Sequence, residues 1–424
     1  MNIIQIISIY TISGLTRGAA LYGVSTIIIE MTKQSSVYPY ETPKTVITLM
    51  STGCLIGSII GSAVGPQIIF QLGRIRSLRF MSLLILLVNI LMFPSIHWVY
   101  FFVLRIISGI SSVFLVTIVP QICIQQVEPK HRGIIGSLTN LNMWAGKFIG
   151  DIIQYFVCQD AQLYPVTQVF ATVMSVAMVI MSYTVKEQTQ QSSQIAPQKE
   201  NIWQAKYRTC FAVALSVGMC LGSTGFTPIL QYSTLIFKSS FDSPKSGAIG
   251  AIITSGITTV SCFLALPVVR KFPRKILFLV GQIMMMLCCL AMIIILYLNL
   301  SKKTSDNIIL ALTVIYIVAY SFSTGTLFFV LMGEIFPLNV KPFFVNLTMG
   351  TNMLSILIVT FIFPLMKQQQ NYIIYFFWTG IVLILINAFV PESFNKTSEM
   401  INEKMIRRRN VLKTELVEIQ MVKV

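Results

Sequence analysis

Long apolar runs, separated by short polar segments, extend from the first residues of the chain to about residue 390. A membrane-spanning helix needs about 20 mainly apolar residues, and runs of this length recur throughout the sequence. The pattern predicts twelve spanning helices, at residues 3–29, 46–70, 80–96, 98–123, 134–157, 164–185, 209–236, 247–269, 276–298, 308–333, 343–366 and 372–390. The expected fold class is therefore an all-α polytopic membrane protein.

The longest polar interruption divides the predicted spans six and six. It is rich in Gln and Ser, and a segment of this composition cannot bury enough apolar surface to fold by itself. We therefore expect an N-terminal six-helix bundle at 1–185, a linker at 186–207, a C-terminal six-helix bundle at 208–391 and a basic tail at 392–424.

Composition agrees with a lipid environment. Hydrophobic residues make up 55% of the 424 residues and charged residues only 11%, whereas an ordinary soluble domain carries about 25% charge. The net charge of +16 does not indicate nucleic-acid binding, because the basic residues form short clusters between apolar runs. The eight cysteines lie mostly inside apolar runs without metal-ligand spacing, and the two histidines show no catalytic spacing. We expect no cofactor, no metal and no enzymatic activity.

The distribution of Lys and Arg among the loops predicts the orientation. The loops after the even-numbered spans, together with the C-terminal tail, hold 21 of these residues, and the loops on the other side hold seven. The more basic side is expected to be cytoplasmic and to carry both termini, which agrees with an even number of spans.

Loop motifs repeat between the two halves. GRIRSLR (73–79) follows the second predicted span, and PRK (273–275) follows the eighth. PQICIQQVEPKHRG (120–133) follows the fourth, and GEIFPLNVKP (333–342) follows the tenth. Matching loops at matching places of two six-helix halves indicate a duplicated transporter fold.

These motifs resemble the major facilitator superfamily and, within it, the sugar porter family. RIISGISSVFLVTIVP (105–120) is similar to the fourth span of that family, STGFTPILQYSTLIF (223–237) to the seventh and PESFNKTSEMI (391–401) to the segment after the twelfth. The resemblance implies two pseudo-symmetric six-helix bundles with a cavity near the midplane, and transport by alternating access.

The resemblance also implies a set of solute-contacting positions. Carried over by position, they are Asn140, Thr227, Gln231, Thr258, Phe329 and Asn352. Several family residues are replaced: the Gln pair of the seventh span is Leu221 and Gly222, and the Trp of the tenth is Phe329. The expected solute is a monosaccharide or related polyol, which uncharged donors and acceptors suit.

A charge network at the cytoplasmic ends is implied in the same way. Glu334 resembles a gate acid expected to pair with Arg274, Lys275 or Lys341 and to hold the two halves together. In the first half the network would keep Arg74 and Arg132.

Three charged residues fall inside predicted spans. Lys147 and Asp151 are four residues apart, on one face of the fifth helix. Arg17 interrupts the first span and is expected to snorkel or to mark a break in the helix. An intramembrane charge is a candidate for function. A carrier of an organic anion or other small metabolite, using Lys147 and Arg17, therefore stays open as an alternative.

No carboxylate stands at the position of the family's proton-coupling acid in the first span, which is Leu21. The sequence favours a uniporter over a proton-coupled carrier. A non-transporting sugar sensor is a further alternative, because many solute-contacting groups differ. The expected partners are a small solute and the lipid bilayer, a monomer suffices, and the plasma membrane is the expected location.

Overall fold

The structure is a computed structural model. It describes residues 3–32, 44–94, 98–124, 127, 129–157, 164–185, 207–231, 246–298, 301–337, 339–363, 366, 368–394, 396, 400–401 and 403. Within several helices the backbone is described without the side chains, as in residues 20–32, 130–134 and 230–231. The expected linker lies outside the described residues except at its last position, 207.

Within these ranges the chain forms twelve spans, ten of them single helices. The single-helix spans are α1 (Ile3–Thr32), α2 (Lys44–Leu72), α3 (Arg74–Leu91), α4 (Trp98–Ile124), α5 (Pro129–Val157), α6 (Tyr164–Thr184), α11 (Ser246–Lys271), α12 (Arg274–Tyr297), α15 (Lys341–Ile362) and α16 (Gln368–Phe389). The seventh span is divided into α8 (Arg208–Ser223) and α9 (Phe226–Gln231). The tenth consists of α13 (Lys302–Tyr320), the π-helical segment η3 (Ser321–Gly325) and α14 (Thr326–Glu334).

Three details differ from the expectation. The third helix begins at Arg74 and not at residue 80. Its first turns carry basic residues and can be helical although they lie outside the apolar run. The seventh span is broken where Gly225 adopts a positive φ of 70°. The first span is not broken at Arg17: α1 is continuous, and the Arg17 side chain is only 3% exposed, so it neither snorkels nor marks a break.

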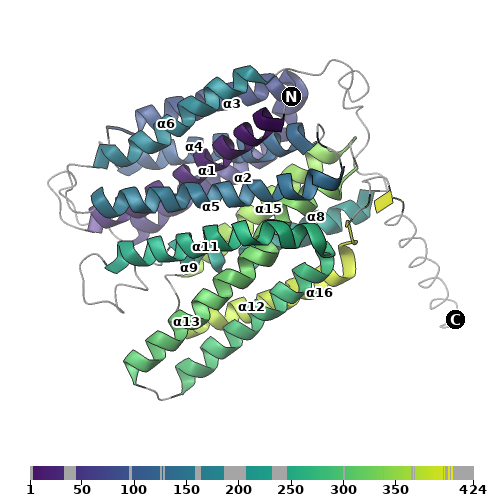
Figure 1. The fold of residues 1–424 in the computed structure, drawn as a ribbon. Helices are drawn as coiled ribbons and strands as arrows, with labels where there is room; N and C mark the ends of the chain where they lie inside the picture. The colour runs from purple at the N-terminus through teal and green to yellow at the C-terminus, as the bar shows by residue number, and fades with distance from the viewer. Residues whose placement is uncertain are drawn as a thin grey trace, which may run out of the picture.

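Each half repeats one packing pattern (Figure 1). In the first half α1 packs against α5 and α6, α2 against α4, and α3 against α4 and α6. In the second half the equivalent spans make the equivalent contacts: α8 with α15 and α16, α11 with the tenth span, and α12 with α13 and α16. The repeated pattern is that of a duplicated six-helix bundle.

The halves meet through two related helix pairs. α5 packs against α11, and α2 packs against α15. The last segment of the tenth span, α14, also packs against α5. The interface therefore runs through the second, fifth, eighth, tenth and eleventh spans.

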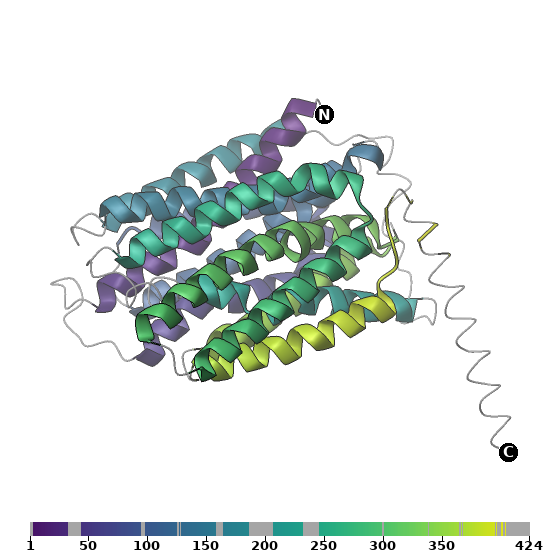
Figure 2. The ribbon, with the colours of Figure 1, turned by 60° about the horizontal axis from the view of Figure 1, so that its bottom comes forward.

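One end of the molecule carries the segment that follows α16, and we call it the tail end (Figure 2). α2, α4, α11 and α14 end there, and α3, α5, α12 and α15 begin there. This arrangement places the repeated loop motifs at a single end of the bundle.

The outer surface is apolar, as expected for contact with lipid. Ile384, Phe377, Tyr297 and Phe263 each expose more than 60% of their surface. Among the described residues, eight helical segments are long and apolar enough to cross a membrane. A soluble protein rarely exposes so much contiguous apolar surface.

Glycines bring the backbones of α2 and α4 into direct contact. A methyl group on Gly57 would overlap the carbonyl oxygen of Ile106, and one on Gly109 would overlap that of Cys54. Small residues at such crossings let membrane helices approach closely, where van der Waals packing replaces the hydrophobic effect as the driving force.

We expect Gly57→Ala to destabilise the protein by about 1–3 kcal/mol, since α2 and α4 must separate to admit the methyl group. Gly380→Ala is the matched control: the nearest atom to an added methyl group there is Met286 Sδ at 3.8 Å. Thermal unfolding of the two purified variants in detergent measures the difference. Equal melting temperatures for the two variants would contradict the close packing.

Candidate functional site

Asn140 lies at the junction of both halves, near the middle of α5. It is completely buried. Its Nδ2 donates to Cys262 Sγ on α11 at 3.2 Å, and its Oδ1 accepts from Trp144 Nε1 at 3.0 Å. A side chain at Gly325 of η3 would lie 3.1 Å from Asn140 Nδ2, which leaves little room for any residue but glycine there. Asn140 is therefore held between the fifth, eighth and tenth spans.

The π-helical segment shapes the tenth span at this junction. Thr324 Oγ1 accepts from Gln282 Nε2 of α12 at 2.7 Å, which anchors the widened turn. Thr326 Oγ1 donates to Ser321 O at 2.6 Å across the same turn. Single π-helical turns are rare in proteins and often occur at functional sites.

An aromatic cluster lies where the seventh span breaks. Phe226 stacks on Tyr320 with ring centroids 3.5 Å apart, and the edge of Trp144 meets Phe226 at 5.2 Å. Tyr316 Oη donates to the carbonyl oxygen of Thr224, the residue that caps the C-terminus of α8. These rings connect α5, α9 and α13 next to Asn140, and such faces suit the apolar side of a small ligand.

The other positions expected to contact solute are dispersed. Thr258 Oγ1 donates to Thr254 O of its own helix at 2.6 Å, so it can offer a ligand only acceptor lone pairs while that bond holds. Thr227 is partly exposed on α9, and the Gln231 side chain lies outside the described residues. Phe329 is buried and lines a small cavity between the halves, together with Gln121 and Lys341.

Asn352, on α15, is 2% exposed, and its Oδ1 has no hydrogen-bond partner among the described residues. A buried amide oxygen without a partner costs about 1–3 kcal/mol, so it is available to a ligand. The structure thus joins Asn140 to α11 and the aromatic cluster and leaves Asn352 with acceptor capacity. Cys262, Trp144 and Tyr320 were not expected from the sequence, because such residues inside apolar runs resemble ordinary core.

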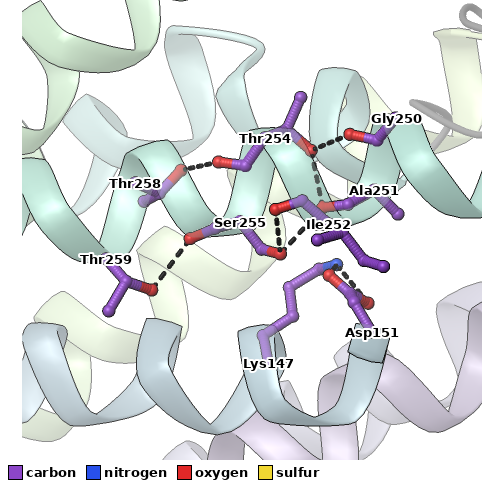
Figure 3. A network of polar contacts seen from close by, with 9 residues as sticks. All are labelled: Lys147, Asp151, Gly250, Ala251, Ile252, Thr254, Ser255, Thr258 and Thr259. Atoms are coloured by element: carbon purple, nitrogen blue, oxygen red, sulfur yellow. Dashed lines mark hydrogen bonds and ion pairs between the residues drawn. The ribbon is translucent and has the colours of Figure 1, made fainter. Parts of the chain in front are cut away.

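Lys147 and Asp151 form a direct ion pair within α5 (Figure 3). Lys147 Nζ lies 2.7 Å from Asp151 Oδ2 and 3.0 Å from Oδ1, and both residues are almost completely buried. The pair faces α11 near Ser255, whose hydroxyl donates to Ala251 O of its own helix at 2.7 Å. Asp151 therefore neutralises Lys147, and the pair lies at the contact between α5 and α11.

Arg17, at the middle of α1, is another buried charge of the spans. Its guanidinium contacts the Ser112 hydroxyl of α4, Ser58 Oγ of α2 at 3.3 Å, and Met353 Sδ of α15 at 3.6 Å. These partners come from both halves of the protein.

A second polar cluster forms at the tail end. Arg274 Nη2 lies 3.4 Å from Glu334 Oε1, and Ser393 Oγ donates to Glu334 Oε2 at 2.8 Å. Glu392 accepts from the backbone N–H groups of Arg274 and Lys275 at 3.0 Å each. The Glu334 ion pair joins α12 to α14 within the second half. Arg274 is one of the three bases that the sequence named for Glu334, and a role of this pair in holding the two halves together stays a prediction.

The remaining residues of the expected charge network are not in that ion pair. Lys275 Nζ donates to Asn387 O at 2.7 Å, and Lys341 Nζ donates to Gly333 O. Arg74 is half-buried at the start of α3, and the Arg132 side chain lies outside the described residues. Near the tail end the halves also come close at Gly136, where an added methyl group would lie 3.2 Å from Val330 Cα.

Comparison with known proteins gives a consistent family. The profile described as "Sugar (and other) transporter" matches residues 18–190 and 182–405. The chain is 21% identical over 405 residues to the glucose transporter GlcP of Staphylococcus epidermidis, covering 87% of this chain and 90% of that protein. It is 20% identical over 395 residues to the sugar transport protein MST7 of Oryza sativa subsp. japonica, covering 82% and 77%.

Solved structures share the fold. The proton:xylose symporter XylE bound to 6-bromo-6-deoxy-D-glucose superposes with a TM-score of 0.82 at 19% identity, over 95% of this chain and 98% of that one. The inward-open form of XylE from E. coli gives 0.72 at 19% identity, over 94% and 99%. The fold is therefore that of the major facilitator superfamily, with two pseudo-symmetric six-helix bundles, as the sequence predicted.

We expect Asp151→Asn to destabilise the protein by about 3–5 kcal/mol, because it leaves the Lys147 cation buried without a counter-charge. The double variant Lys147→Met/Asp151→Leu removes both charges and should recover most of that loss. Melting temperatures of both variants in detergent provide the measurement. A double variant no more stable than Asp151→Asn would show that the pair does not act as a neutral unit.

Proposed function

Because this chain belongs to the family of sugar (and other) transporters, we propose that it is a facilitative carrier that moves a monosaccharide or related polyol by alternating access. The chain is a multi-pass membrane transporter and not an enzyme. The observation that carries the proposal is the polar and aromatic junction around Asn140, which lies where the two halves meet. In transporters built from repeats, solute sites lie near the midplane at this kind of interface.

The chemistry of the junction fits a polyhydroxyl solute. Carboxamides offer both donors and acceptors, as sugar hydroxyls require, and Asn352 Oδ1 has acceptor capacity to spare. The Trp144, Phe226 and Tyr320 rings provide the apolar faces against which a sugar ring packs. The named relatives, a glucose transporter and a sugar transport protein, agree with this class of solute.

The carboxylates in the spans support uniport. Proton coupling usually needs a titratable acid inside a span. Among the described side chains of the spans, Asp151 is held by Lys147 and Glu334 by Arg274. Neither acid is free at the midplane to exchange a proton with the transport cycle.

The polar cluster at the tail end is proposed to act indirectly on the closing of the two halves against each other at the cytoplasmic face. Glu334 ends α14, and α14 packs against α5 of the other half. Holding Glu334 with Arg274 and Ser393 fixes the end of α14, and through it the contact between halves. We take the tail end to be cytoplasmic because most Lys and Arg residues of the loops gather there, and the plasma membrane is the proposed location.

Uptake into proteoliposomes containing the purified protein tests the function. We expect saturable uptake of at least one labelled hexose, pentose or polyol, stimulated when unlabelled solute is preloaded inside. An imposed pH gradient should not drive accumulation. No uptake above empty liposomes for the whole panel would overturn the proposal, and pH-driven accumulation would replace uniport with proton coupling.

Glu334→Gln tests the tail-end cluster. Loss of a charge-assisted contact worth about 1.5–3 kcal/mol should lower the uptake rate on the order of tenfold, while the protein still inserts and elutes as a monodisperse peak. Glu403→Gln, at an exposed acid of the tail, is the control and should transport normally. Normal uptake by Glu334→Gln would remove Glu334 from the closing mechanism.

A further inference from the structure

Arg17 is a buried cation that the proposed sugar site does not use. It is 3% exposed and lies at the middle of α1. Its partners Ser58, Ser112 and Met353 also lie near the middle of their helices, α2, α4 and α15. The guanidinium is therefore near the midplane, between the first half and α15 of the second, in the zone where carriers bind their solutes.

Every partner of this guanidinium is electrically neutral. Nη1 contacts the hydroxyls of Ser112 and Ser58 and lies 3.7 Å from Cys54 Sγ. Nη2 contacts the thioether sulfur of Met353 at 3.6 Å, and a thioether is a weak acceptor. Nη2 is therefore the donor that a stronger acceptor would capture most readily.

The two serines present only lone pairs to Arg17. Ser58 Oγ donates its hydrogen to Cys54 O at 2.8 Å, and Ser112 Oγ donates to Gly109 O at 3.2 Å. The close approach of α2 and α4 at Gly109 brings these groups together. Hydroxyl dipoles orient toward the cation, but they do not neutralise it, and an uncompensated buried charge costs several kcal/mol.

The carboxylates of the spans whose side chains the structure describes have other partners. Asp151 is paired with Lys147, and Glu334 with Arg274. Arg105, a third buried arginine of the spans, lies nearer the far end of α4 and has contacts of its own. Among the described residues at mid-height, Arg17 is thus the one cation that lacks an anionic partner.

We propose that Arg17 binds a carboxylate group of the transported solute, so that the substrate is a monosaccharide acid, such as a hexuronate; this rests on the proposed function as a sugar carrier. The guanidinium fork matches the two oxygens of a carboxylate and forms charge-assisted hydrogen bonds with them. The hydroxyls of the same solute are left to the Asn140 junction and to Asn352.

The charge of the site selects a carboxylate over a phosphate. A carboxylate carries one negative charge, which the single charge of Arg17 cancels. A phosphate monoester carries about −1.5 to −2 at neutral pH and would leave excess negative charge in a medium of low dielectric. Lys147 cannot supply the second positive charge because Asp151 holds it.

The test compares labelled glucuronate and glucose in proteoliposomes made with wild-type protein, Arg17→Gln, Arg17→Lys and Arg79→Gln. Arg79 is the matched control: it is a half-buried arginine at the tail end, stacked 5.0 Å from the Tyr183 ring. We expect saturable glucuronate uptake by the wild type and by Arg79→Gln. The rate of glucuronate uptake by Arg17→Gln should fall at least about tenfold, since hydrogen bonds to charged groups contribute about 1.5–3 kcal/mol. Arg17→Lys should be intermediate, and Arg17→Gln should favour glucose over glucuronate relative to wild type.

A second measurement needs no variant. Glucuronate should raise the melting temperature of the wild-type protein in detergent more than glucose at the same concentration, because a ligand stabilises the state that binds it. If chloride stabilises the protein and glucuronate does not, an inorganic anion and not a sugar acid balances the charge of Arg17, and the inference is overturned.

The remaining outcomes separate this inference from the proposed function. Glucose uptake by the wild type, with glucuronate neither transported nor competing, would overturn the carboxylate site and leave sugar transport standing. Equal loss of both solutes in Arg17→Gln would give Arg17 a general role and also overturn the inference. Failure to transport any sugar, acidic or neutral, would overturn the proposed function itself.

Discussion

Hydrocarbon supplies no hydrogen-bond partners, and this constraint decides where each polar side chain of the spans can lie. The hydroxyls of α11 bond back to carbonyl oxygens of their own helix, as Thr254 and Thr258 do. Lys147 satisfies its charge within one helical turn, with Asp151. Against this background, the polar groups that remain incompletely satisfied stand out as sites for a visiting molecule. Among the described residues, two such groups lie near the middle of the spans at the contact between the halves: the Asn352 oxygen, which has no hydrogen-bond partner, and the Arg17 cation, whose partners are neutral.

The duplicated packing pattern explains how one chain builds both a site and a hinge. Equivalent helices make equivalent contacts in the two halves, so each half is a self-contained bundle. The halves join through α5 with α11 and α2 with α15, which are related to each other by the same repeat. A symmetric pair of contacts lets one half rock against the other without changing its own packing, the motion that alternating access requires.

Hydropathy predicted most of this architecture, because a span must be apolar along its whole length wherever lipid surrounds it. The spacing of Lys147 and Asp151 also placed them on one helical face, where the structure pairs them. What the pattern could not give were features that depend on a neighbouring helix. The break at Gly225 fits around the Tyr375 ring, and Cys262 matters because Asn140 reaches it from another span. The motif limited the partner of Glu334 to three bases of the same half, Arg274, Lys275 and Lys341, but it could not tell which of them the packing of α12 against α14 brings within reach.

The C-terminal segment has a consequence for how the protein is made. Glu392 provides the hydrogen-bond acceptors for the first backbone N–H groups of α12, and Ser393 holds Glu334 at the end of α14. These contacts join residues separated by more than a hundred positions in the first case and by 59 in the second. During synthesis the first amides of α12 therefore lack their Glu392 acceptors, and Glu334 lacks its Ser393 donor, until nearly the whole chain has been made. A nascent chain stopped just after α16 would lack the Glu392 acceptors for the first amides of α12, and its Glu334 would keep Arg274 but lose Ser393.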